Sequence, residues 1–362
     1  DAYNVAIGYV AGKYITTGVQ NTLVGGLAGD ALTTGTNNVA VGFQALSTQD
    51  VNGQNVAVGT QALRDQIVAG HGNNTAVGHQ AGLSVTTGVQ NTLIGSGAGD
   101  ALTTGGYNVA FGYRALGAED AHGNNTAIGY SALRLQNAGA DAYNVAVGYN
   151  AGEAVSTGVY NTLIGGKTGD ALTTGTRNVA IGYLALTAED AASYNVAIGV
   201  QALQNQDGAE YNTAVGHGAG EAITTGNQNT LIGGLAGDAL TDGNTNVAVG
   251  YLALSAETRG DRNVAVGRQA LASQNNTSDT DAYNVGVGYN AGLSVTTGTQ
   301  NTLIGGLAGD NITTGSYNIA IGHGALQAED ANGTNVAIGR QALFAQDAGA
   351  DVYNIAIGYN AG

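Results

Sequence analysis

Carboxylates are the side chains in this sequence best suited to chemistry, and adjacent pairs of them recur at long intervals. The pairs are Glu119–Asp120, Glu189–Asp190 and Glu329–Asp330. Two carboxylates can act as general acid and general base when they converge in one pocket. Because these pairs lie far apart along the chain, we expect them to solvate the surface separately. We therefore expect no enzymatic activity.

A second set of acids follows glycine directly. Asp30 ends the glycine-rich stretch 25–30, and the arrangement returns at Asp100, Asp170, Asp238 and Asp310. Calcium-binding rolls place Asp after Gly-Gly-x-Gly-x in every second turn, so that successive turns share one ion. The spacing here is different, and we expect these aspartates to cap turns. No cofactor is expected, with calcium as the alternative.

The five histidines are scattered singly along the chain. They are His71, His79, His122, His217 and His323. A metal site requires clustered ligands. We therefore expect these histidines to be surface aromatic residues and not metal ligands.

The composition excludes or disfavours several classes of function. The 362 residues include 61 Gly but no Pro, Cys, Met or Trp. Without cysteine there are no disulfides, thiolate metal sites or cysteine nucleophiles. Ten basic residues against 26 acidic ones give a net charge of −16, which disfavours nucleic acid and anionic lipid as partners. No run approaches the roughly 18 apolar residues of a membrane span, so we expect no membrane contact in this segment.

A short repeat, with a period of about 17 residues, organises the chain. Its motif has the form Asn-Val/Thr-Ala/Leu-Ile/Val-Gly, and 21 copies occur, four of which differ from it at one position. We number the positions of each repeat from this asparagine. The first eight copies begin at Asn4, Asn21, Asn38, Asn55, Asn74, Asn91, Asn108 and Asn125.

The repeats are of four types that return in order, which gives a super-repeat with a period of about 70 residues. In the first two types position nine is Gly and position twelve is aliphatic; in the last two, position nine is Leu and position twelve is polar. We interpret 1–362 as one continuous repeat domain and as a segment of a longer fibre. The super-repeats span 4–73, 74–143, 144–211, 212–283 and 284–353, with a partial one at 354–362.

The first five positions of each repeat predict a short β-strand that ends at glycine. Val5 and Ile7 alternate with Asn4 and Ala6 on the two faces of such a strand. Position five is glycine in every copy, which indicates a positive φ or a backbone approach too close for a Cβ atom. The first four of these glycines are Gly8, Gly25, Gly42 and Gly59. A strand, a turn, a second strand and a return loop would form one rung, so we predict an all-β parallel β-solenoid, or β-roll, of about 21 rungs.

Stacked rungs would bring equivalent residues together. We expect the asparagines to form a ladder in which their side-chain amides bond neighbouring rungs. One aliphatic side chain per rung, from position nine or position twelve, is expected to fill a common core. One strand face would pack inside the rung. We expect the other, lined by Ala at position three, to be covered by further copies in a side-by-side homotrimer.

Tyrosines flank the expected strand on both sides, at position six and immediately before the asparagine. The candidates for surface contact are Tyr9, Tyr113, Tyr143, Tyr149, Tyr194, Tyr289 and Tyr317. We expect them to cover rung edges or seams between chains, with the hydroxyl in water; stacking on carbohydrate or contact with a host is the alternative. Thr-Thr-Gly turns suggest ice binding, but Thr-Thr occurs in only two repeat types, and adjacent Thr side chains in an extended segment point opposite ways.

Some repeats match a known pattern. The Asn-Val-Ala-Ile-Gly copies at 178–182 and 335–339 resemble the head repeats of YadA-like trimeric autotransporter adhesins. The Asn-Thr-Ala-Val-Gly copy at 74–78 is similar to repeat arrays of phage tail-fibre shafts. The resemblance implies a left-handed parallel β-roll, three chains side by side, and attachment to a surface or host.

We therefore expect the shaft or head of an extracellular adhesive fibre, on a bacterial surface or a virion. Its expected partners are further copies of the same chain and a glycan or protein on the host or cell surface. One alternative is a self-assembling extracellular filament. The other is a glycan-binding module that uses the tyrosine rows and the longer loops at 138–143 and 275–283.

Overall fold

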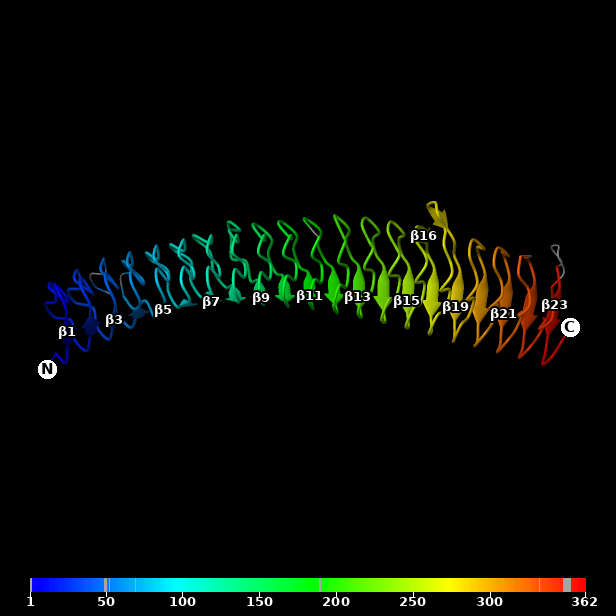
Figure 1. Cartoon of the computed structure of the whole chain (residues 1–362), viewed down its shortest axis with the longest axis horizontal. Coiled ribbons are helices and arrows are strands. Elements are labelled where there is room, and N and C mark those ends of the chain that lie inside the picture. Colours follow the sequence, from blue (N-terminus) through cyan, green and yellow to red (C-terminus); the bar gives the residue numbers. More distant parts are fainter. Residues whose placement is uncertain are drawn as a thin grey trace. The chain divides into compact units, whose positions relative to one another are not determined.

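The computed structural model describes residues 2–48, 51, 53–68, 70–188, 190–331, 333–347 and 353–362. These residues form strands, turns and loops and contain no helix. The chain divides into two compact units, Asp1–Asn178 and Val179–Gly362. Figure 1 shows the strands in chain order, coloured along the sequence. Each unit is a parallel β-solenoid in which most rungs bond to a neighbour that lies 17 positions further along the chain. The predicted all-β parallel β-solenoid with a period of about 17 residues is confirmed.

Each repeat contributes one strand of three residues, at positions two to four. The first unit contains β1 (Val5–Ile7), β2 (Thr22–Val24), β3 (Val39–Val41), β4 (Val56–Val58), β5 (Thr75–Val77), β6 (Thr92–Ile94), β7 (Val109–Phe111), β8 (Thr126–Ile128), β9 (Val145–Val147) and β10 (Thr162–Ile164). The second contains β11 (Val179–Ile181), β12 (Val196–Ile198), β13 (Thr213–Val215), β14 (Thr230–Ile232), β15 (Val247–Val249), β17 (Val264–Val266), β19 (Val285–Val287), β20 (Thr302–Ile304), β21 (Ile319–Ile321), β22 (Val336–Ile338) and β23 (Ile355–Ile357).

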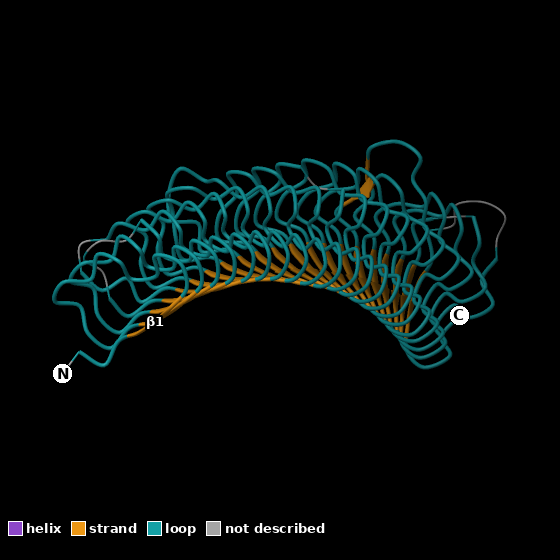
Figure 2. Cartoon of the chain, turned by 60° about the vertical axis from the view of Figure 1, so that its left-hand side comes forward, coloured by secondary structure: helices purple, strands orange, loops and turns teal. Residues whose placement is uncertain are grey.

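Within each unit, neighbouring strands pair in parallel without a slip in register. Val5 lies opposite Thr22, and Thr22 lies opposite Val39. Figure 2 shows these strands side by side. The β-branched residues at positions two and four favour this extended backbone, and the repeat brings identical positions into contact.

The expectation of a second strand in each rung is wrong for the described residues, because positions seven to eleven form turns. Position seven has a left-handed φ, as at Val10 (65°), and so does position nine, whether Gly12 (58°) or Leu63 (47°). A left-handed residue bends the chain, so a strand cannot continue through it. The turns still stack from rung to rung: the Leu27 N–H donates to the Tyr9 carbonyl at 2.9 Å.

Glycine at position five is required for two reasons at once. All 21 copies have φ between 130° and 144°, where L side chains are strained. A Cβ on Gly112 would also lie 2.2 Å from the carbonyl oxygen of Gly129 on the next rung. The glycine column therefore lets successive rungs approach backbone to backbone.

The core of each coil is narrow and built from small and aliphatic side chains. Except in the terminal rungs, position three is buried, as at Ala40 and Leu93, and so is the alanine at position eight. Leu63 from position nine and Val85 from position twelve converge on one space: their side-chain carbons lie 2.9 and 3.3 Å from the point where a Cβ on Gly82 would sit. The exchange between positions nine and twelve thus fills one common core.

The Ala-lined face of the strand lies inside the coil, so its expected role between chains is wrong. Ala57 and Ala127, at position three, are fully buried within the single chain. The outward face carries positions two and four, such as Thr126 and Ile128 in β8; Thr126 is partly exposed and Ile128 is 37% exposed. Alternation defines two faces, but it is the narrow interior that selects the smaller residues for the inside.

Two further strands of two residues lie outside the main stack. They are β16 (Gly260–Asp261) and β18 (Thr280–Asp281), and they pair in parallel. The longer loop at 275–283 carries β18 and projects beyond the neighbouring return loops, as Figure 1 shows in yellow beside the β16 label.

Candidate functional site

The asparagines at position one form a hydrogen-bonded ladder in each unit. The Asn21 Oδ1 atom accepts the Asn38 backbone N–H at 3.0 Å and the Asn38 side-chain amide at 3.1 Å. The Asn21 Nδ2 group donates to the Gly35 carbonyl, in the return loop of the same rung, at 2.9 Å. Such an amide joins the next rung through its oxygen and closes its own rung through its nitrogen; Asn125 is an exception, because its Nδ2 group has no hydrogen-bond partner. The first unit's ladder bonds link Asn4, Asn21, Asn38, Asn55, Asn74, Asn91, Asn108 and Asn125.

The paired acids are divided between core and surface, which corrects the expectation that both solvate the surface. Glu119 and Glu329, at position twelve, are fully buried, whereas Asp120 and Asp330 are exposed. Position twelve points into the coil, where the first two repeat types place an aliphatic side chain. Burial raises the pKa of the Glu119 carboxyl above its ordinary value. Glu189 lies outside the described residues.

Glu257, also at position twelve, shows how the coil satisfies a buried carboxylate. Its Oε1 atom accepts the backbone N–H groups of residues 258–260 at 2.7–3.1 Å and that of Asn276 at 3.0 Å. Its Oε2 atom accepts from the side-chain amides of Gln274 at 2.8 Å and Asn276 at 2.9 Å. This glutamate, which the sequence analysis did not single out, therefore braces the coil; its place at position twelve was the available signal.

The aspartates that follow glycine are single, partly buried carboxylates. Desolvation by burial raises the pKa of each of them, namely Asp30, Asp100, Asp170, Asp238 and Asp310. The Asp238 Oδ1 atom is buried and has no hydrogen-bond partner. Two groups of three potential metal ligands occur in the described residues, and neither includes these aspartates.

The outward face of the strands forms a partly exposed apolar stripe along each unit. It consists of Val, Ile or Thr at position two and Val, Ile or Phe at position four. Phe111 is 52% exposed, and Ile128 and Ile164 are each 37% exposed. An extended apolar patch of this kind is typical of an interaction surface.

Exposed tyrosines form rows on either side of this stripe. Tyr130 stacks between Tyr113 and Tyr149, with ring centroids 5.2 and 5.4 Å apart. On the other side, the stacked pairs are Tyr143 with Tyr160 and, in the second unit, Tyr194 with Tyr211. All seven tyrosines named from the sequence are exposed, namely Tyr9, Tyr113, Tyr143, Tyr149, Tyr194, Tyr289 and Tyr317.

Arginines extend the tyrosine rows in the second unit. The Arg268 guanidinium lies 5.6 Å from the centre of the Tyr289 ring, and Arg262 lies at the same distance from Tyr283. Stacked aromatic and guanidinium planes give the edges of the stripe flat, amphipathic contact surfaces. Such surfaces suit either another protein chain or a sugar ring.

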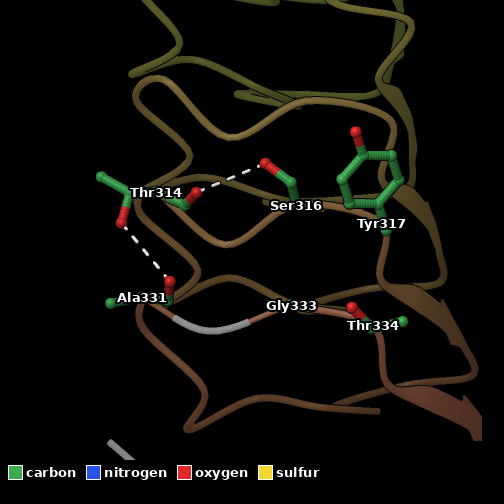
Figure 3. A pocket seen from close by; sticks show the side chains of 6 residues that line it. All are labelled: Thr314, Ser316, Tyr317, Ala331, Gly333 and Thr334. Atoms are coloured by element: carbon green, nitrogen blue, oxygen red, sulfur yellow. Dashed lines mark hydrogen bonds between the residues drawn. The ribbon is translucent and has the colours of Figure 1, made fainter. Parts of the chain in front are cut away.

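A shallow hollow of about 240 Å³ lies among the return loops of the second unit. Figure 3 shows Thr314 and Ser316 on one side of it, with Tyr317 beside them. The Ser316 hydroxyl contacts the Thr314 carbonyl at 3.5 Å, and the Thr314 hydroxyl contacts the Ala331 carbonyl at the same distance. Its six lining residues are small or neutral, so the hollow offers hydrogen bonds but no titratable acid or imidazole.

One histidine differs from the others. Four are exposed single side chains, namely His71, His79, His217 and His323. His122 is partly buried in the loop that carries Glu119 and Asp120, and the three residues offer ligand atoms within 4.8 Å of one another. Sequence reasoning missed this group because it treated acids and histidines separately; the signal was the run Glu-Asp-x-His in one loop.

None of the described segments is a helix long and apolar enough to cross a membrane. No protein-family model matches the chain, and no curated protein matches it. The resemblance of its repeats to adhesin heads and tail-fibre shafts therefore rests on the motifs themselves.

Proposed function

We propose that this chain is a structural segment, shaft or head, of an extracellular adhesive fibre on a cell surface or a virion. The observation that carries the proposal is the repetition of one bonded rung: neighbouring strands pair in parallel within each unit, and the asparagine ladder accompanies them. Each added rung brings the same backbone bonds and the same layer of core, so stability increases with length. A spacer that holds an attachment surface away from a cell or virion requires this property.

We infer that further copies of the chain cover the outward apolar stripe in a side-by-side homotrimer. The apolar groups recur once per rung, at about 4.8 Å, and another copy presents apolar groups at the same spacing. The tyrosine rows would lie along the seams, where one side of the ring is covered and the hydroxyl stays in water. The number three is what the resemblance to YadA-like heads implies.

Light scattering on the full chain tests the trimer. We expect a mass near three times the 35.8 kDa of one chain. The double substitution Ile128→Lys and Ile164→Lys places charge on the stripe and should yield folded monomers, whereas Thr104→Lys, on an exposed return loop, should leave the trimer intact. A folded monomer from the unmodified chain would overturn the inferred interface.

A glycan-binding module is the second candidate, and the stacked tyrosines favour it because sugar rings pack on aromatic faces. A glycan array on the full chain separates the two functions. A passive shaft gives no hits, whereas a binding module gives hits that Tyr130→Ala removes. A self-assembling filament would instead appear as masses that grow with concentration beyond three chains.

A further inference from the structure

The loop 119–122 in the first unit brings together a buried carboxylate, an exposed carboxylate and an imidazole. Glu119 is fully buried, Asp120 is exposed, and His122 is partly buried. One ligand atom from each residue lies within 4.8 Å of the other two. This is the one group of three or more potential ligands in the described residues that includes a nitrogen donor.

Two buried atoms of this loop have no hydrogen-bond partner. They are Glu119 Oε2 and His122 Nδ1. A buried polar atom without a partner costs free energy, so the pair requires an explanation. The His122 Nδ1 and Glu119 Oε1 atoms are 3.5 Å apart without hydrogen-bond geometry. Two donors bound at 2.0–2.2 Å to one tetrahedral zinc ion also lie about 3.4 Å apart.

We propose that Glu119, Asp120 and His122 bind a divalent transition-metal ion of the zinc class. Zinc accepts carboxylate oxygens together with a borderline imidazole nitrogen, whereas calcium prefers oxygen ligands alone. Asp120, at the surface, gives the ion access from solvent. Three protein ligands leave a fourth position for water.

The backbone of this loop is held by hydrogen bonds to the neighbouring rung, to Asn108 and to Glu119. The Asp120 carbonyl accepts the Thr103 N–H at 2.5 Å and the Thr103 hydroxyl at 2.7 Å. The His122 carbonyl accepts the Asn108 side-chain amide at 3.2 Å, and the His122 N–H donates to Glu119 Oε1 at 3.1 Å. The side-chain donors are therefore held close together before any ion binds, which lowers the entropic cost of binding.

An equivalent loop in the second unit shows that a buried glutamate alone does not make such a site. Glu257 has donors for both of its oxygens, and Thr258 and Gly260 stand where the first unit has Asp120 and His122. That loop therefore needs no ion. The orphaned atoms beside Glu119 are a property of its own repeat and do not depend on the proposed fibre function.

Isothermal titration calorimetry of the full chain with Zn²⁺ tests the proposal. We expect one saturable site per chain. The substitutions His122→Asn and Asp120→Asn should each weaken binding by more than about tenfold, because removal of a residue that only supports a metal ligand already weakens binding by about tenfold or more. His79→Asn, at an exposed single histidine, is the matched control and should bind as the unmodified chain does. Co²⁺ should give the visible absorption of a low-symmetry site with a nitrogen ligand, and His122→Asn should alter it.

Three results would overturn the site. The absence of saturable Zn²⁺ binding would leave Glu119 and His122 as a simple ion pair. Binding that His122→Asn does not weaken would exclude the imidazole as a ligand. Binding that Asp330→Asn removes would place the ion at the all-carboxylate group of Glu329, Asp330 and Asp347. Circular dichroism of each variant shows whether the fold is retained.

Discussion

At the scale of single residues, the side-chain amide of the ladder asparagine makes two kinds of hydrogen bond in many rungs. The Asn229 Oδ1 atom accepts the Asn246 N–H at 2.9 Å, while its Nδ2 group donates to the Gly243 carbonyl at 2.8 Å. Asparagine suits this place because it carries both an acceptor and a donor on a short, neutral side chain. Aspartate would lose the donor, and glutamine would reach too far. The ladder was predictable from the sequence, because an asparagine that starts every repeat must lie next to its equivalent when the repeats stack.

The position-twelve glutamates show where residue type misleads. Charge predicts a surface location, yet Glu119 is buried because the coil turns position twelve inward. The sequence contained a usable signal: Leu32 occupies the same position in another repeat type and is buried. The sequence did not indicate which groups donate hydrogen bonds to each buried glutamate. Glu257 and Glu119 have different donors because different residues follow them in the chain.

Five partly buried aspartates predict that stability increases on mild acidification. Burial raises the pKa of Asp30, Asp100, Asp170, Asp238 and Asp310 in the folded chain. The unfolded value is about 3.9, so between the two the folded state binds more protons. The free energy of unfolding therefore increases as the pH falls through the raised folded-state pKa values. It decreases again as the pH rises through them.

Urea unfolding at pH 7 and pH 5 measures this dependence. We expect a higher midpoint at pH 5, and replacement of all five aspartates by Asn should reduce the difference. Asp279→Asn, at an exposed position, should leave it unchanged. A lower midpoint at pH 5 in the unmodified chain would show that these carboxylates are not desolvated in the folded state.

At the scale of the element, each rung is one short strand followed by bends at positions seven and nine. Strand positions were predictable because β-branched residues alternate with alanine and end at glycine. The bends were not, because leucine at position nine is an unusual residue for a left-handed backbone. Leu116 has φ 54° and is fully buried, so burial of its side chain in the core offsets about 1 kcal/mol of backbone strain.

Adjacent glycines in the second unit provide a matched test of the turn. A Cβ on Gly233 would lie 2.5 Å from the Gly250 carbonyl oxygen, and its φ is +137°. A Cβ on Gly234 would meet only the Tyr251 ring, at an ordinary 3.5 Å. We expect Gly233→Ala to destabilise the unit by about 3 kcal/mol or more, and Gly234→Ala to change stability by about 0.5 kcal/mol or less. Equal melting temperatures for the two variants would refute close backbone approach as the reason for the glycine column.

At the scale of the whole molecule, the proposed function rests on the repetition of one rung. Parallel pairing, the asparagine ladder and the glycine column recur in each unit, so length is set by the number of repeats. The fold class followed from the period alone. The face that turns outward did not, because it depends on bends at position seven and, in half of the repeat types, at a leucine in position nine, and neither residue set is typical of a left-handed backbone.

The spacing between rungs tests this central claim most directly. The chain has no native cysteine, so Tyr9→Cys and Tyr149→Cys can carry two spin labels at position six of the first unit, diluted among unlabelled chains. These positions are eight rung steps apart, from β1 to β9, or about 38 Å. Deletion of the super-repeat 74–143 removes four of these steps and should shorten the distance to about 19 Å while the chain stays folded. An unchanged distance, or a broad distribution in the shortened chain, would contradict a modular stack of equivalent rungs.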